Sequence, residues 1–217
     1  MTVEEAKTIL KEAGLQLVQS GLTTGTWGNI SLRVNEDLMV VTPSGMDYLK
    51  ITEKDIPVVD LASEQWTGPK PSSEYKLHAA IYRFREDAGA VIHTHSTNSS
   101  VVAAARREVP AVLDDLVQII GPTVRVADYA LPSTRAMVKK TLKSLKGRNA
   151  ALLANHGAVC LGRDMEEAFV ACQVLEKACK AFIEGEFLGG VKSINRFEAV
   201  LMHQVYLKKY SKIRMKK

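Results

Sequence analysis

Two short runs of β-forming residues on either side of a polar turn restrict the fold of this chain more than any other feature. Residues 30–34 and 38–42 flank Asn35-Glu36-Asp37, a pattern that predicts a β-hairpin. Residues 58–62 and 65–67 flank another short turn and predict more antiparallel strand. We therefore expect a largely antiparallel sheet, unlike the parallel order of a dinucleotide-binding fold.

Helical periodicity alternates with these strands. Thr2 and Glu5 form a capping box before an amphipathic run over 3–20. Further helices are predicted over 74–85, 97–107, 134–146, 164–184 and 195–210, further strands over 90–95, 150–154 and 158–161, and strand or mixed structure over 111–120 and 123–126. The expected fold is α/β of the α+β type, with a central, mostly antiparallel sheet covered by helices on both faces. Since no linker rich in Pro, Gly or Ser divides the chain, residues 1–217 are expected to form a single domain.

The positive charge of the chain is concentrated in its last ten residues. The formal charge is +5, and the final segment holds Lys208, Lys209, Lys212, Arg214, Lys216 and Lys217. We interpret this basic tail, 208–217, as a solvated or frayed terminus, and expect neither nucleic acid nor a membrane as partner. Acidic residues near Met1 and the lack of a long apolar run favour a cytoplasmic soluble protein. Three cysteines without a Cys-x-x-Cys motif argue against a disulfide framework or a structural zinc site.

A short apolar strand, 90–95, ends in the sequence His93-Thr94-His95. Side chains alternate along a strand, so the two imidazoles point the same way and can bind one ion. The alternative is two histidines satisfied at a strand end. His156 follows another apolar strand and Glu74 begins a helix, so together they could supply N3 or N3O ligation to a zinc-like ion.

Other interpretations of these residues remain open. Glu74 could simply favour the helix dipole as a first-turn acid. His78 lies four residues after Glu74 on the same helical face and is a rival ligand. His203 has apolar neighbours and is more typical of a core or boundary histidine.

Three separate loops share the same chemistry. Residues 23–29, 42–47 and 69–73 are rich in glycine, hydroxyl and amide groups and carry almost no charge. Backbone amides and hydroxyls can hold a phosphate dianion, especially beside a helix N-terminus such as the one expected at Ser73.

Five motifs occur together in a familiar order. They are Gly25-Thr26-Trp27-Gly28-Asn29-Ile30-Ser31, Thr42-Pro43-Ser44-Gly45, Pro71-Ser72-Ser73-Glu74, His93-Thr94-His95 and Asn155-His156-Gly157. In order and spacing the chain resembles the class II aldolase/adducin-like family over nearly its full length. The resemblance implies Zn2+, or another divalent ion such as Mn2+ or Co2+, held by Glu74, His93, His95 and His156. It also implies a phosphate site formed by Gly28, Asn29, Ser44, Gly45, Ser72 and Ser73.

The resemblance implies an activity as well. The expected reaction is reversible retro-aldol cleavage of a ketose 1-phosphate, such as L-fuculose 1-phosphate or a 5-deoxypentulose 1-phosphate, to dihydroxyacetone phosphate and an aldehyde. Glu74 would serve as the base at the carbon next to the carbonyl. The same scaffold carries pentulose-phosphate 4-epimerases, sugar-acid-phosphate decarboxylases and methylthioribulose-phosphate dehydratases, and the adducin head is a non-enzymatic interaction module. Members with the metal site form homotetramers with sites at subunit interfaces, which is also expected here.

Two positions depart from the family pattern or extend it. Where aldolases of the family carry a tyrosine after an Ile-Pro-Ala segment, this chain has Val109-Pro110-Ala111 followed by Asp114. Asp114 is either an acid/base group or a loop acid, and as a proton donor it would need a raised pKa. Tyr210 falls where the family has a tail tyrosine, so it is a second candidate proton donor, or else an ordinary residue of a terminal helix.

Overall fold

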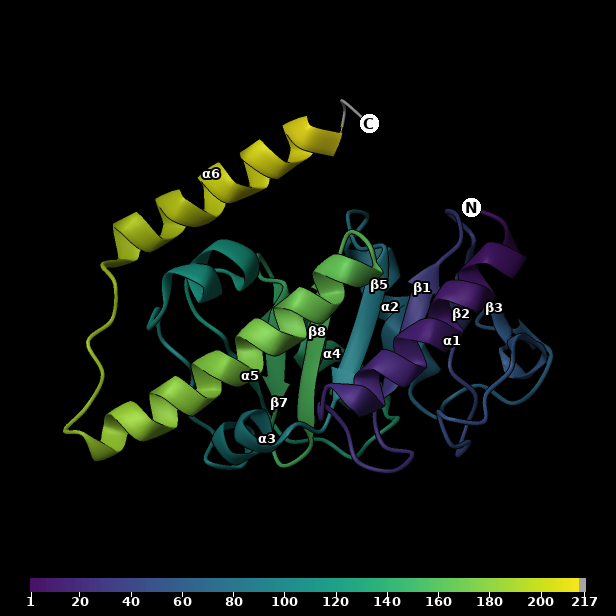
Figure 1. The fold of residues 1–217 in the computed structure, drawn as a ribbon, viewed down its shortest axis with the longest axis horizontal. Helices are drawn as coiled ribbons and strands as arrows, with labels where there is room; N and C mark the ends of the chain where they lie inside the picture. The colour runs from purple at the N-terminus through teal and green to yellow at the C-terminus, as the bar shows by residue number, and fades with distance from the viewer. Residues whose placement is uncertain (215–217) are drawn as a thin grey trace.

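The computed structural model describes the backbone of residues 1–214 and the side chains of residues 1–209. Within this range one sheet has eight strands in the order β4-β3-β2-β1-β5-β8-β7-β6 (Figure 1). The strands are β1 (Asn29–Arg33), β2 (Leu38–Val41), β3 (Val58–Asp60), β4 (Trp66–Thr67), β5 (Ala90–Thr94), β6 (Val126–Ala127), β7 (Ala150–Leu153) and β8 (Gly157–Gly162). Neighbouring strands run antiparallel except β6 and β7, which are parallel. The expected mostly antiparallel sheet is confirmed.

Helices cover both faces of this sheet, as the sequence predicts. They are α1 (Val3–Gln19), α2 (Tyr75–Phe84), α3 (Thr97–Ala104), α4 (Arg135–Leu145), α5 (Met165–Phe187) and α6 (Arg196–Arg214), with the short turns η1 (Glu53–Asp55) and η2 (Leu116–Ile120). Helices α1, α3 and α5 pack on one face, and α1 and α5 lie in front of the sheet in Figure 1. Helices α2 and α4 pack on the other face.

The strand period of two divides the core between these faces. In β5, Ala90 and Ile92 belong to the core beneath α1 and α5, whereas Val91 belongs to the core beneath α2 and α4. His93 therefore points to the α2 side. Asn29 of β1 lies directly opposite His93 in the antiparallel register, so the two side chains share that face and are cross-strand neighbours.

The start of α3, immediately after His95, is fixed by a carboxylate from α5. Glu176 accepts hydrogen bonds at 2.8 and 2.9 Å from the backbone N–H groups of Asn98 and Ser99, and others from their side chains. This carboxylate satisfies N–H groups that the first helical turn leaves without partners. The segment that carries His95 is thus held at the end of β5.

The region after α3 differs from the sequence prediction. Residues 111–120 contain no strand but end in the π-helical turn η2, and the neighbouring strand, β6, is limited to two residues. Asp115 caps η2 by accepting from the N–H of Leu116, and Gly121 ends it with a φ of 132°. Leu116, Val117 and Ile120 are buried. The apolar residues of this run therefore pack against helices α5 and α6 and do not form a strand of the sheet.

Helix α6 lies outside the two layers and packs mainly against η2 (Figure 1). Ala199, 0% exposed, and Met202 contact Ala111 and Val117 in a small separate apolar cluster. The backbone of the basic tail, 208–217, continues α6 as far as Arg214, whereas the side chain of Tyr210 lies outside the described residues. In the described part of the chain, no helix carries an apolar stretch of the length that a membrane crossing requires.

Candidate metal centre

Three histidines converge at the end of β5 and the start of β8. His93 is the fourth residue of β5, His95 follows the strand, and His156 occupies the turn between β7 and β8. Their ring centroids lie 4.7 to 5.1 Å apart with steeply tilted planes. One nitrogen from each ring falls within 4.8 Å of the others. His156 thus lies beside His93 and His95, as its position after an apolar strand predicts.

Glu74 brings a carboxylate into the same space. It is the N-cap residue of α2, 5% exposed, and its side chain is directed at the histidines instead of at the helix N-terminus. Glu74 Oε2 lies 3.2 Å from His93 Nε2, and Oε1 lies 3.5 Å from His156 Nε2. Oε1 is buried and has no hydrogen-bond partner among the described residues. An orphaned carboxylate oxygen facing imidazole nitrogens is typical of a site that binds a cation.

The ring orientations favour metal binding. His93 Nδ1 lies 2.8 Å from the carbonyl oxygen of Ala158; because a carbonyl only accepts, Nδ1 carries the proton and the lone pair is on Nε2. The His93 and His95 Nε2 atoms are 2.9 Å apart. Two ligands bound tetrahedrally at about 2.1 Å lie about 3.4 Å apart, close to the separations seen here. The four residues therefore fit a divalent ion.

The protonation states of Glu74, His95 and His156 at neutral pH also favour binding of a cation. Burial and the neighbouring His93 and His156 lower the pKa of His95 to about 4, and burial together with His93 lowers the pKa of His156. Burial raises the pKa of Glu74, but His93, His156 and the Asn29 amide outweigh it and leave the pKa below its ordinary value. Neutral imidazoles and an ionised carboxylate are the forms that bind metal.

The geometry of the turn that carries His156 accounts for the residue types on either side of it, Asn155 and Gly157. Asn155 has a φ of 56°, in the left-handed region that asparagine tolerates better than most residues. A Cβ on Gly157 would lie 2.3 Å from the carbonyl oxygen of Thr94. Glycine here lets β8 approach the end of β5 closely, and this approach brings His156 to His93 and His95.

The loops predicted to bind phosphate meet beside this cluster. The segments around Ser44 and Ser72 are joined by a bridge between Pro43 and Pro71 and by a 3.0 Å bond from Ser44 N to Lys70 O. The backbone of Ser72 bonds to Thr42 O at 2.9 Å. Ser44, Gly45 and Ser73 are exposed, while Ser72 and Asn29 are buried. The structure thus brings the loops together, and their role toward phosphate stays a prediction.

Gly28 connects these loops to the histidines, and we expect its replacement to be costly. Gly28 has a φ of 77°, and an added Cβ would lie 2.6 Å from the backbone oxygen of His93. We expect Gly28→Ala to lower the free energy of unfolding by about 2–4 kcal/mol, from the left-handed backbone and the clash. Gly25 has a φ of 62° and nothing within 4 Å, so Gly25→Ala should cost only about 1–2 kcal/mol. Urea unfolding of both variants measures the difference, and equal losses would contradict the proposed clash.

Trp27 offers a direct optical test of metal binding. Its indole is 66% exposed, and its ring centroid lies 5.6 Å from that of His95. The chain has two tryptophans, and Trp66 lies in β4, four strand spacings from β5, or about 19 Å. We expect Co2+ to quench the Trp27 emission and to leave most of the Trp66 emission.

The control for this quenching is Trp27→Phe, which keeps an aromatic ring and leaves Trp66 as the only tryptophan. Titration with Co2+ should leave the emission of this variant nearly unchanged. Equal quenching of wild type and variant would place the bound ion away from the histidines.

The remaining candidates among the described residues contribute no ligand atom to the cluster. Both ring nitrogens of His78 are engaged, one by Asn29 Oδ1 and the other by Ser31 Oγ at 2.6 Å, and burial, with His93 as a second cause, lowers its pKa to about 3. It is therefore not aimed at the cluster as a rival ligand. His203 Nδ1 donates to Gln118 O at 2.8 Å, in agreement with a boundary role. Asp114 is exposed just before η2.

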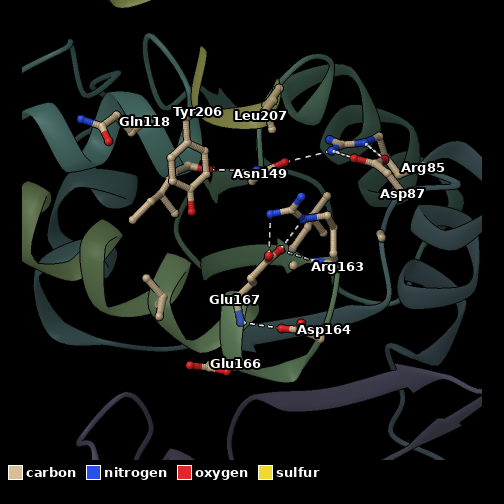
Figure 2. Close-up of a pocket in the computed structure, with 15 residues that line it drawn as sticks. Arg85, Asp87, Gln118, Asn149, Arg163, Asp164, Glu166, Glu167, Tyr206 and Leu207 are labelled. Atoms are coloured by element: carbon tan, nitrogen blue, oxygen red, sulfur yellow. Dashed lines mark hydrogen bonds and ion pairs between the residues drawn. The ribbon is translucent and has the colours of Figure 1, made fainter. Parts of the chain in front are cut away.

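A cavity of about 370 Å³ lies at the opposite end of β5 and β8. Figure 2 shows that both arginines of its lining are paired: Arg163 with Glu167, and Arg85 with Asp87. Tyr206 of α6 closes one side. The cavity shares no residue with the histidine cluster, so the candidate chemistry is not located there.

A mostly antiparallel α+β scaffold with three convergent histidines and a buried carboxylate has the donor set of a divalent-ion site. The sequence profile described as Class II Aldolase and Adducin N-terminal domain matches residues 9–183. The chain belongs to this family. Because class II aldolases are metal-dependent and named aldolases are among its relatives, the chain is an enzyme, a class II aldolase, and not an adducin-like interaction module.

Named relatives agree with this assignment. The chain is 37% identical over 186 residues to the 5-methylthioribulose-1-phosphate/5-deoxyribulose-1-phosphate aldolase of Rhodospirillum rubrum, covering 82% of this chain and 83% of the relative. It is 33% identical over 194 residues to the 5-deoxy-D-ribulose 1-phosphate aldolase of Bacillus thuringiensis serovar kurstaki, covering 88% and 91%. A solved L-fuculose 1-phosphate aldolase superposes with a TM-score of 0.89 at 34% identity, covering 93% and 96%.

Proposed function

We propose that the enzyme cleaves a short ketose 1-phosphate reversibly to dihydroxyacetone phosphate and an aldehyde. The relatives described above are named for a 5-deoxyribulose, a 5-methylthioribulose or an L-fuculose, each carrying a 1-phosphate. These names support a ketose 1-phosphate as the substrate class. Within the class we propose a 5-deoxypentulose 1-phosphate, because two relatives that match over 194 and 186 residues act on one by name.

The observation that carries this proposal is the unpartnered Oε1 of Glu74. A buried carboxylate oxygen is costly unless it is hydrogen-bonded or paired, so an oxygen without a partner is suited to take up a cation or a proton. Here it lies beside His156 Nε2, where both roles are open to it. A carboxylate that can leave a cation and accept a proton suits proton transfer at the carbon next to a carbonyl.

In the mechanism that we propose, Glu74, His93, His95 and His156 hold the metal. A divalent ion at these residues would act as a Lewis acid that stabilises negative charge on the substrate oxygens. In the synthetic direction, Glu74 takes the proton from the carbon of dihydroxyacetone phosphate that forms the new bond. In the cleavage direction, Glu74 returns this proton to the same carbon after the bond to the aldehyde carbon has broken.

We propose that the phosphate is held without lysine or arginine. Gly28, Asn29, Ser44, Gly45, Ser72 and Ser73 offer amides and hydroxyls, and α2 begins directly after this loop. Its N-terminal N–H groups and dipole favour a dianion. Asn29 uses one amide N–H on Glu74, which leaves its second N–H for the substrate.

The proton on the aldehyde oxygen needs a separate donor. We propose Asp114 or Tyr210 for this role, supplied by a neighbouring subunit of a homotetramer, because Asp114 is exposed and lies before a turn that packs on α6. Zn2+ is proposed as the ion, since three imidazoles and a carboxylate suit it. We also propose that the enzyme works in the cytoplasm. Sizing chromatography that gives only monomers would contradict the shared site.

The decisive experiment is a substrate panel. Purified protein is loaded with Zn2+, Mn2+ or Co2+ and given ketose 1-phosphates and 5-phosphates, and the release of dihydroxyacetone phosphate is followed with a coupled reductase. We expect release from 5-deoxypentulose 1-phosphate and L-fuculose 1-phosphate and none from the 5-phosphates. Carbon dioxide release, or pentulose 5-phosphate interconversion without cleavage, would overturn the proposal.

A further inference from the structure

A hydrogen-bonded series of buried polar groups extends from Tyr82 of α2 to the Oε2 atom of Glu74. Asn29 Nδ2 lies 3.2 Å from Glu74 Oε2, and Asn29 Oδ1 contacts His78 Nε2. His78 Nδ1 lies 2.6 Å from Ser31 Oγ, which lies 2.9 Å from the hydroxyl of Tyr82. His78 and Ser31 are 0% exposed and Tyr82 is 1% exposed. Water therefore does not reach these groups to replace a lost partner.

An ionised Glu74 sets the direction of each hydrogen bond in this network. An ionised Glu74 accepts only, so Asn29 must present its N–H groups to Glu74 and its oxygen to His78. His78 Nε2 must then carry the proton, which leaves Nδ1 as an acceptor for the hydroxyl of Ser31. Ser31 has a single hydrogen and gives it to His78, so it accepts from the Tyr82 hydroxyl at 2.9 Å, for which Gly89 O at 3.4 Å is the more distant alternative acceptor. Every donor points toward Glu74.

This polarity has a consequence at the cluster. Glu74 Oε2 is satisfied by Asn29, whereas Oε1 is left without a hydrogen bond among the described residues. If the Asn29 amide rotated by half a turn, its oxygen would face the carboxylate and repel it. A His78 ring protonated on Nε2 opposes that rotation, because the rotated amide would turn its N–H groups toward the N–H of Nε2. The donor role of His78 Nε2 thus keeps the Asn29 amide on Glu74 Oε2 and leaves Oε1 without a hydrogen bond.

We propose that His78 is a positioning residue for the aldol reaction: by donating from Nε2 to Asn29 it orients the Asn29 amide, anchors Glu74 Oε2 and keeps Oε1 available for proton transfer. The inference rests on the proposed function in one respect, since it assigns the proton transfer to Glu74. The hydrogen-bond polarity itself is independent of substrate.

Two amide variants distinguish the role of Nε2 of His78 from the role of Nδ1. The Nε2 of a glutamine lies as many bonds from Cβ as the Nε2 of histidine, so His78→Gln keeps a donor toward Asn29. The amide of an asparagine corresponds instead to Nδ1, so His78→Asn keeps a polar group beside Ser31 and loses the donor to Asn29. Both variants remove the ring and are similarly polar, so a purely structural role predicts similar losses.

We expect His78→Asn to lower kcat on the ketose 1-phosphate about 10- to 100-fold, with KM changed less than 3-fold and bound metal unchanged. His78→Gln should keep kcat within about 3-fold of wild type. Equal kcat values for the two folded, metal-loaded variants would overturn the proposal. If His78→Asn does not fold, Ser31→Ala takes its place: it removes the donor to Nδ1 and should lower kcat about 3- to 10-fold, and an unchanged kcat would count against the proposal.

A second readout does not depend on activity. Nitrogen NMR of histidine-labelled, metal-free protein reports the tautomer of each of the five histidines. We expect His78, assigned from the signal lost in the His78→Gln variant, to carry its proton on Nε2. A proton on Nδ1 would overturn the inference even if the enzyme is an active aldolase. A wild type that cleaves no ketose phosphate, with the expected tautomer present, would instead overturn the proposed function alone.

Discussion

Glu74→Gln is expected to reduce kcat by about 10²- to 10⁴-fold, the range that a positioned general base contributes, while the protein still binds a divalent ion. Glutamine has nearly the shape of glutamate and can keep its oxygen toward Asn29 Nδ2. Its amide nitrogen would then occupy the place of Oε1, where it can neither accept a proton nor bind a cation. Steady-state kinetics and metal analysis on the same samples measure both effects.

The three histidines explain why metal should survive this change. Removal of the carboxylate leaves three imidazole ligands, enough for catalytic zinc sites in general. A matched control is Glu167→Gln, which neutralises a carboxylate paired with Arg163 at the opposite end of β8. That control should keep wild-type kcat. If Glu74→Gln bound metal and kept full turnover, Glu74 would not be the base.

The sequence predicts much of the fold because the relevant signals are local. The hairpin of β1 and β2 follows from two β-rich runs and a polar turn, and the capping box at Thr2 and Glu5 is present as predicted. His93 and His95 could be paired from the strand period alone. His156 could be added because it follows a strand of the same kind.

Other features depend on contacts between distant segments and could not be predicted in this way. The run 111–120 is apolar enough for a strand, but its last five residues form the π-helical turn η2, which packs against α5 and α6. His78 shares a helical face with Glu74, which made it a rival ligand. Its actual partners, Asn29 and Ser31, come from β1, some 47 to 49 residues away. Spacing within one helix carries no information about such partners.

The free oxygen of Glu74 is the clearest example of this limit. A glutamate before a helix is ordinarily a favourable first-turn charge, and the sequence alone keeps that interpretation open. In the folded chain the side chain makes no cap hydrogen bond and faces three imidazoles instead. The folded structure, and not the residue type, distinguishes a helix cap from a candidate base.

His93→Asn is expected to abolish both metal binding and turnover while the protein stays folded. The asparagine amide can replace Nδ1–H as donor to Ala158 O, the bond that holds the ring in place. It has no counterpart of Nε2, so the nitrogen that faces His95 and Glu74 is lost. Loss of residues that merely support a metal ligand costs about 10- to 100-fold in affinity, and loss of the ligand itself should cost more than 100-fold.

The matched control for this variant is His203→Asn. His203 is a buried histidine whose Nδ1 also donates to a backbone carbonyl, that of Gln118, at 2.8 Å. It should keep both metal and activity, because it lies in α6 apart from the cluster. Calorimetric titration with Zn2+ and thermal unfolding compare the two variants. If His93→Asn retained wild-type affinity for Zn2+, the ion would have to bind elsewhere, and the cluster would lose its role in the proposed reaction.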